Sequence, residues 1–138
     1  QTPPRLADGT PFPTFYYATC PKLTGAISTL ESSGLMAQMN ERLQSDAKLA
    51  GDYLAAHVDY EAARSAVAKQ VNLDVPEIEG VTAGGMPDRV KCLHSLIAHA
   101  LAAGSDVNPL GDEALNALES WWLTKPCSEI SNLLGEDK

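Results

Sequence analysis

The sequence predicts a mainly helical α+β domain of about five helices, preceded by a short N-terminal strand or an extended arm. Apolar residues recur at helical spacing in several segments, and glycine and proline residues separate those segments. The first residues differ, because prolines at positions 3, 4, 11 and 13 exclude a helix there. A length of 138 residues, of which 44% are hydrophobic, suits a single domain over residues 1–138 with one core.

The N-terminal segment is expected to be extended. Asp8 and Gly9 mark a turn, and the aromatic run from Thr14 to Thr19 is rich in residues that favour strands. No partner strand is evident downstream in the sequence. This run therefore either pairs with a segment that precedes it in the full protein or lies as an arm on the helices.

Two short helices should follow the arm. Pro21 suits the first position of a helix, with Thr19 or Cys20 as the cap before it, and Gly34 supplies a stop. Apolar residues recur at steps of three and four in both helices: Leu23, Ile27 and Leu30 in the first, then Leu35, Met36, Met39 and Leu43 in the second.

Caps and helix breakers mark the remaining helices. Ser45-Asp46 is expected to cap a long third helix that runs to about Val71. A loop rich in glycine and proline at residues 74–86 precedes a fourth helix, which should begin at Pro87 and end at Gly104. A fifth helix is expected at residues 114–123, with an apolar side formed by Leu115, Leu118 and Trp122.

The charge balance disfavours two classes of partner, although a local basic patch remains compatible with it. The chain carries 18 acidic and 10 basic residues and a net charge of -8, so its general field repels nucleic acid and anionic membrane. No run approaches the roughly 18 apolar residues of a membrane span.

Three cysteines, odd in number and widely separated, fit a reducing compartment better than a disulfide framework. We expect a cytoplasmic protein whose cysteines are free thiols or ligands: Cys20, Cys92 and Cys127.

The expected fourth helix contains a thiol and two imidazoles. At about 100° per residue, Cys92 and His99 fall on one flank of its apolar arc and His94 falls on the other. A regular helix therefore cannot direct all three at one metal ion, and Cys92 and His99 could share a site only through a substrate, a cluster or ligands from elsewhere. The alternative is a buried structural cysteine with two half-exposed histidines.

The glycine pair before that helix indicates an anion-binding corner. Gly84 and Gly85 can adopt positive φ and direct backbone N–H groups at one spot, and the following helix would add its N-terminal dipole. Arg89 and Lys91 would add positive charge there. The alternative is a plain connector between two elements.

A polar stripe is expected along the third helix. His57, Tyr60 and Arg64 follow Tyr53 at steps of four, three and four, which places them on one face. Such a face can line a cleft, and a solvated face is the alternative. Cys20 would lie at the start of a helix, where the thiolate form is favoured. Near the C-terminus, one ring of Trp121-Trp122 could contact a partner.

Three stretches of the sequence resemble one bacterial family. They are "GTPFPTFYYATCP", "GGMPDRVKCLH" with the following "AHALAAG", and "NPLGDEAL". Together they resemble the domain of unknown function 501, which is common in actinobacteria, over nearly all of the chain. The positions that match the family's motifs are Cys20, Gly84, Gly85, Arg89, Lys91, Cys92 and His94 and, less specifically, His57, Tyr60, Arg64 and His99.

The resemblance implies an upstream segment of the form "RCPCG" before the point where this sequence starts. Its thiols would join Cys20 and Cys92 in a zinc or iron-sulfur site, and its absence would leave the N-terminal strand unpaired. The family has no established activity. Its genes often lie beside those for a septum-formation initiator and an exopolyphosphatase, which implies a link to cell division or phosphate metabolism.

We therefore expect a cytosolic binding protein with a metal or cluster on Cys20, Cys92 and upstream cysteines, and with His99 as a further candidate ligand. An anion-binding corner would lie beside it, formed by Gly84, Gly85, Arg89, Lys91, Arg64 and Tyr60. The first alternative is an enzyme acting on a phosphorylated or other anionic small molecule, with Cys92, His94 and His57 in acid-base or nucleophilic work. The second is an interaction module for a cell-division or polyphosphate-related protein.

Overall fold

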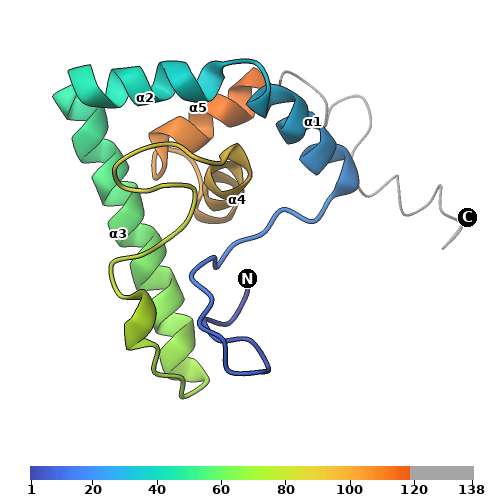
Figure 1. Cartoon of the computed structure of the whole chain (residues 1–138), viewed down its shortest axis with the longest axis vertical. Helices are drawn as coiled ribbons and strands as arrows, with labels where there is room; N and C mark the ends of the chain where they lie inside the picture. The colour runs from blue at the N-terminus through green and yellow to red at the C-terminus, as the bar shows by residue number, and fades with distance from the viewer. Residues whose placement is uncertain (119–138) are drawn as a thin grey trace, which may run out of the picture.

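In the computed structural model the chain folds into helices that pack around a central helix (Figure 1). The structure describes residues 1–118. The mainly helical class is confirmed. Within residues 1–118 no β-strand forms, and the extended N-terminal segment contains one isolated bridge between Arg5 and Pro11. The elements in chain order are α1 Pro21–Glu31, α2 Leu35–Ser45, α3 Ala47–Gln70, a short 3-10 turn η1 Pro76–Ile78, α4 Leu93–Ala103 and α5 Pro109–Ala117.

The run at residues 14–19 forms the extended arm rather than a strand. The arm runs beside α3 (Figure 1), and the backbone N–H groups of Phe15 and Tyr16 donate to the hydroxyl oxygen of Tyr60 on that helix. Phe15 is fully buried in the core. The arm therefore obtains its hydrogen bonds from a helix side chain, which replaces the ladder that a partner strand would provide.

The predicted starts of α1, α2 and α3 are confirmed. Pro21 occupies the first turn of α1 after an extended Cys20, and Gly34 precedes α2 with a φ of 89°. The Asp46 side chain caps α3 by accepting from the backbone N–H of Leu49 at 3.1 Å. Each boundary follows from residues that lie within a few positions of it.

The predicted start of the fourth helix is wrong, because α4 begins at Leu93 and not at Pro87. The segment before it folds into turns, with the N–H groups of Asp88 and Lys91 donating to the carbonyls of Gly85 and Gly84. The side chain of Asn40, on α2, then holds both backbone groups of Val90, at 2.7 Å and 3.0 Å. This contact fixes Val90 outside the helix, while Gly84 and Gly85, with φ of 68° and 92°, begin the turns that precede it.

The fifth helix starts earlier than predicted. Asn108 caps α5 through its side-chain oxygen, which accepts from the N–H of Gly111 at 2.9 Å, and Pro109 fills the first turn. A side chain at Gly111 would collide with the backbone of Leu96, so this glycine lets α5 pack closely on α4. The remainder of the predicted helix, with Trp121 and Trp122, and also Cys127, lies outside the described residues.

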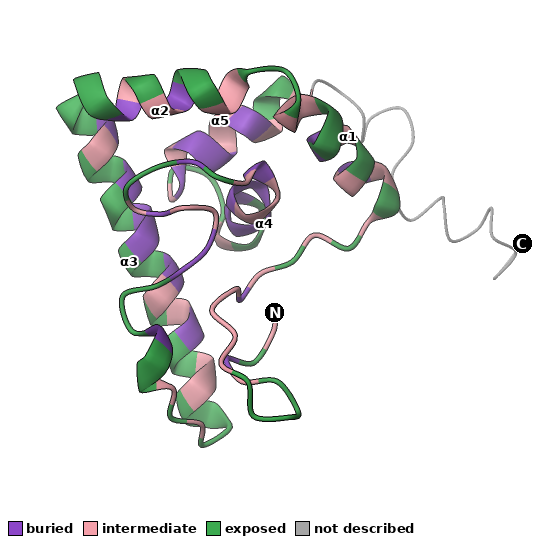
Figure 2. Ribbon diagram, in the orientation of Figure 1, coloured by how far each residue is buried: buried purple, intermediate pink, exposed green. Residues whose placement is uncertain are grey.

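The core surrounds α4, which lies at the centre of the molecule and is buried along most of its length (Figure 2). Helices α1 and α5 pack against α4, while α2 and α3 contact each other and α3 contacts α5. No helix within residues 1–118 has the length and apolar character needed to cross a lipid bilayer. The largest fully buried apolar and aromatic side chains are Tyr53, Tyr60, Phe15, Ile27, Met39, Leu93, Leu96, Ile97 and Leu110.

Candidate functional site

Three side chains with metal-binding atoms meet where the end of α1 approaches the start of α4. Glu31 is the last residue of α1, Cys92 immediately precedes α4, and His94 lies in the first turn of α4. One ligand atom from each side chain lies within 4.8 Å of the other two. All three residues are partly buried. We call Glu31, Cys92 and His94 the Glu–Cys–His cluster.

The Glu31 carboxylate joins the two helices. Its Oε2 atom accepts from the backbone N–H of Leu93 at 2.8 Å and lies 3.0 Å from Nδ1 of His94. The carboxylate thus caps the N-terminus of α4 from another helix and orients the imidazole. Within residues 1–118 every hydrogen bond of this carboxylate goes to Oε2, which leaves Oε1 available to a ligand.

Hydrogen bonding keeps Glu31 ionised. Partial burial acts to raise its pKa, but the hydrogen bonds from His94 and from the N–H of Leu93 outweigh burial, so its pKa lies below the ordinary value. On the other side of the ring, Nε2 of His94 lies 3.3 Å from the carbonyl oxygen of Thr24 and 3.5 Å from Oγ of Ser28. The imidazole is therefore held along α1.

Cys92 contributes a free thiol to the cluster. Its Sγ atom lies 4.0 Å from Oγ of Ser95, and Cys92 is the free cysteine among residues 1–118. A thiolate, an imidazole and a carboxylate are the three side-chain types that bind zinc. Three protein ligands leave the fourth tetrahedral position open, which is the arrangement of zinc sites that bind a water or a substrate.

The sequence argument that separated Cys92 from His94 is wrong. It placed both residues inside a regular helix, whereas Cys92 is extended, with φ of -154° and ψ of 123°. Its side chain is therefore free of the helical phase that governs His94. Glu31 was not predicted, and its one signal in the sequence is an acidic residue in the last turn of a helix, where the dipole disfavours it.

Two other predicted ligands lie outside the cluster. Cys20 precedes the first residue of α1, at the far end of that helix from Glu31, a span of about 16 Å. Cys20 is disulfide-bonded rather than a free thiol, which differs from the sequence prediction. His99 is fully buried on α4, and its ring atoms bond elsewhere.

The hydrogen bonds of His99 determine its tautomer. The Asn108 side-chain oxygen accepts from Gly111, so its amide nitrogen faces Nδ1 of His99 at 3.2 Å and donates to it. The proton of the ring then lies on Nε2, which donates to Asp59 at 2.8 Å. Rings on two sides complete the enclosure, with Tyr16 stacked at 5.8 Å and Tyr60 edge-on at 5.1 Å.

The polar stripe on α3 faces the interior, so the solvated alternative is wrong. Tyr53, His57, Tyr60 and Arg64 are all buried. Each polar head holds irregular backbone or a loop side chain. The Tyr53 hydroxyl donates to the carbonyl of Arg89 at 3.0 Å, and Nδ1 of His57 lies 2.9 Å from Oγ1 of Thr82.

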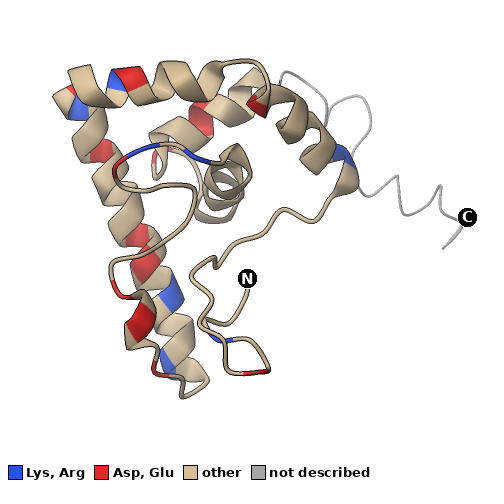
Figure 3. Cartoon of the chain, viewed as in Figure 1, with Lys and Arg blue, Asp and Glu red and all other residues tan. Residues whose placement is uncertain are grey.

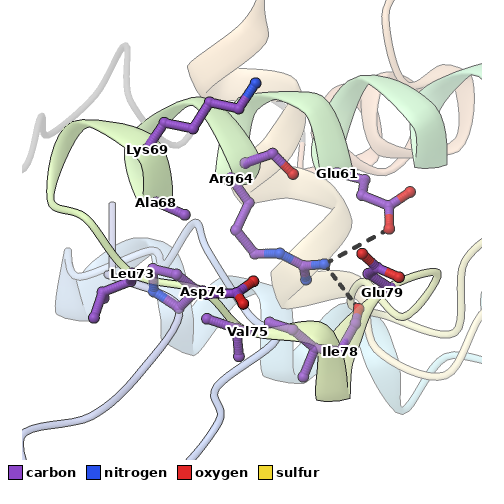
Figure 4. Close-up of a pocket in the computed structure, with 11 residues that line it drawn as sticks. Glu61, Arg64, Ala68, Lys69, Leu73, Asp74, Val75, Ile78 and Glu79 are labelled. Carbon is purple, nitrogen blue, oxygen red and sulfur yellow. Dashed lines mark hydrogen bonds and ion pairs between the residues drawn. The ribbon is translucent and has the colours of Figure 1, made fainter.

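The Arg64 guanidinium forms hydrogen bonds with backbone carbonyl groups. Its guanidinium donates to the carbonyl oxygens of Pro13, Val81 and Ile78 at 2.7, 2.7 and 3.0 Å, and burial lowers its pKa. Figure 4 shows the guanidinium in a hollow between α3 and residues 73–79, directed at Glu61 and the Ile78 carbonyl. Burial likewise raises the pKa of Tyr60, whose oxygen already accepts from the arm.

The remaining predicted anion-binding residues lie together in a different hollow. Gly84, Gly85, Arg89 and Lys91 line a depression of about 430 Å³ that also contains Thr14 and Thr82. Arg64 and Tyr60 do not line it. The structure therefore divides the predicted anion-binding set into a structural group on α3 and a surface group on the loop before α4.

Comparison with known proteins gives one match. A family model described as a protein of unknown function (DUF501) matches residues 1–116. No curated protein and no solved structure matches the chain. The matched range includes the Glu–Cys–His cluster, the stripe on α3 and the hollow beside Gly84 and Gly85.

Proposed function

The chain belongs to the DUF501 family of proteins of unknown function, and we propose that it binds a divalent transition metal, zinc foremost, through Glu31, Cys92 and His94. The observation that carries this proposal is the convergence of a carboxylate, a thiol and an imidazole within 4.8 Å, from two helices. It replaces the ligand set of Cys20, Cys92 and His99 that the sequence predicted. Zinc would supply Lewis-acid chemistry at an open fourth position.

The surroundings of the cluster support metal binding. His94 is already oriented by Thr24 and Glu31, which limits the rotamer freedom that binding would remove. Oε1 of Glu31 is open while Oε2 remains bonded to the N–H of Leu93, so the carboxylate can bind an ion without releasing the cap of α4. Mixed sulfur, nitrogen and oxygen donors fit zinc better than calcium or magnesium, which prefer oxygen alone.

Equilibrium dialysis of reduced protein, first stripped with a chelator, tests the proposal. Wild-type protein should bind about one equivalent of zinc, and Cys92→Ser, His94→Gln and Glu31→Gln should each weaken binding at least about tenfold. Glu41→Gln is the matched control, because Glu41 is an exposed carboxylate on α2.

Cobalt provides an independent readout of the thiolate ligand. Cobalt-loaded wild-type protein should show a sulfur-to-metal charge-transfer band, and Cys92→Ser should lack it. Less than about a tenth of an equivalent of zinc in the wild type, or a band that persists in Cys92→Ser, would overturn the proposal.

A thiol enzyme acting on an anionic small molecule is the second candidate. The cluster brings a thiol and an imidazole within 4.8 Å of each other, and a carboxylate bonds Nδ1 of that imidazole, which are the group types of a thiol nucleophile with a base. In metal-free protein, His94→Gln should then slow alkylation of Cys92 by iodoacetamide about tenfold or more. A Cys92 that resists alkylation in the folded protein, yet reacts in urea, would exclude this candidate.

The wider role stays a prediction. The cell-division or polyphosphate-related partner and the cytoplasmic location rest on family resemblance and composition. Neither adds to the metal proposal, which depends only on the cluster.

A further inference from the structure

We propose a second site, for a small oxyanion-bearing molecule such as a phosphate compound, in the hollow that Arg89 and Lys91 share with Gly84 and Gly85. The hollow measures about 430 Å³, which is within the size range of small-molecule sites. It is lined by the loop before α4 and by the N-terminal arm. This site does not rest on metal binding.

The loop before α4 carries two cations in a chain that is acidic overall (Figure 3). Among residues 1–118, four cations form ion pairs with carboxylates: Arg5 with Glu77, Arg42 with Glu113, Lys48 with Asp52, and Arg64 with Glu61. Within the same described range, Arg89, Lys91 and Lys69 are exposed and form no ion pair, but Arg89 and Lys91 line one hollow together, whereas Lys69 lines another. Two uncompensated positive charges two positions apart on one loop favour an anionic ligand between them.

Hydroxyl groups complete the lining. Thr82 is 6% exposed, and its Oγ1 lies 2.9 Å from Nδ1 of the buried His57. The arm contributes Thr14, and Asp88 adds a single carboxylate to the lining. Two cations and two hydroxyls against one carboxylate give a lining that suits an oxyanion and not a cation.

The loop that carries the cations is held by a partly buried side chain from α2 and by buried polar side chains from α3. Asn40 bonds both backbone groups of Val90, and Tyr53 bonds the carbonyl of Arg89. Arg64 holds the carbonyl of Val81 at the other end of the loop. The backbone on both sides of the hollow is therefore fixed before any ligand binds, which reduces the entropy cost of binding.

The glycine pair closes this loop through its carbonyl groups. A Cβ atom on Gly85, whose φ is 92°, would lie 2.6 Å from the carbonyl oxygen of Arg89. The N–H groups of Asp88, Arg89 and Lys91 are already bonded to the carbonyls of the glycine pair. Because α4 begins only at Leu93, recognition would use chiefly the Arg89 and Lys91 side chains, in place of the helix-dipole corner that the sequence indicated.

Titration of isotope-labelled, chelator-treated protein with inorganic phosphate tests this site, with sodium chloride keeping the ionic strength constant. Saturable amide shifts should concentrate at residues 81–91 and at Thr14. Arg89→Gln and Lys91→Gln should each weaken phosphate binding about tenfold or more, through loss of a charge-assisted hydrogen bond. Both residues are exposed, so both variants should fold.

Lys69→Gln is the matched control, because Lys69 is an exposed cation on α3 that lines a different hollow. Its phosphate affinity should equal that of the wild type. Shifts that fail to saturate, shifts spread evenly over the surface, or wild-type affinity in both Arg89→Gln and Lys91→Gln would overturn the proposal. Because zinc is absent throughout, failure here is distinct from failure of the metal proposal.

Discussion

His94 and His99 lie on the same helix, five positions apart, but differ in burial and in the side chains around them. His99 is fully buried, and both of its ring nitrogens are bonded, to Asp59 and to Asn108. The His94 side chain is 32% exposed and lies in a cluster with Glu31 and Cys92. Both ring nitrogens of His94 also have partners, Glu31 and Thr24, so the two rings differ in their exposure and in the thiol and carboxylate that lie beside His94.

The surroundings of the two rings explain the contrast. Of the partners of His99, Asn108 caps α5 and Asp59 lies on α3, and the ring itself packs against Tyr16, so His99 connects α3, α4 and the start of α5. The partners of His94 lie at helix ends, where backbone groups have no intrahelical partner and carboxylate oxygens remain open. Substitutions should therefore separate a stability role from a binding role.

The largest effect is expected from His99→Ala. It leaves Asn108 and Asp59 without their partner and opens a cavity, so the free energy of unfolding should fall by about 2–5 kcal/mol. His94→Ala should cost under about 1 kcal/mol in metal-free protein. Urea denaturation followed by circular dichroism measures both. Equal losses would remove the distinction between the two histidines.

Zinc should stabilise the protein through one histidine only. At zinc concentrations one hundred times the dissociation constant, the free energy of unfolding should rise by about 2.7 kcal/mol. This increment should survive in His99→Ala and disappear in His94→Ala. Urea denaturation with and without zinc gives the comparison, and an increment retained in His94→Ala would contradict the assignment of His94 as a ligand.

Asn108→Ala, which removes a partner of the buried His99, should lower the free energy of unfolding by less than His99→Ala does. It removes the cap of α5 and the donor to His99, so the free energy of unfolding should fall by about 1–2 kcal/mol. Zinc binding should not change. Asn116→Ala, at an exposed position of α5, is the control. A loss no greater than that of the control would show that Asn108 does not hold α5.

The smallest effect concerns pH and Glu31. The pKa of Glu31 in the folded protein lies below its ordinary value of 4.5, so its contribution to stability is present above pH 4.5 and is lost as pH falls through the folded pKa. In metal-free protein, wild type should exceed Glu31→Gln in unfolding free energy by less than about 1 kcal/mol at neutral pH. Urea denaturation across pH should show this margin shrinking below pH 4.5; a margin that grows there would have the wrong sign.

Part of the candidate site was predictable. Cys92, His94, Arg89 and Lys91 were selected from one short stretch, and the structure brings Cys92 to His94 and Arg89 to Lys91. Glu31 was missed because its role depends on where α1 ends relative to α4. The polar face of α3 was correctly aligned, but its burial depends on the arm and the loop that cover it.

The sequence by itself determined the helical class, the starts of α1, α2 and α3, and an N-terminal segment that is not helical, because caps, prolines and apolar periodicity act within a few residues. Only the tertiary structure decided where α4 begins, since Asn40, fifty positions away from Val90, holds the backbone that would otherwise join the helix. The candidate metal cluster depends on that late start. A non-local hydrogen bond leaves no periodic signal in the sequence, so its consequences appear only after the helices have packed.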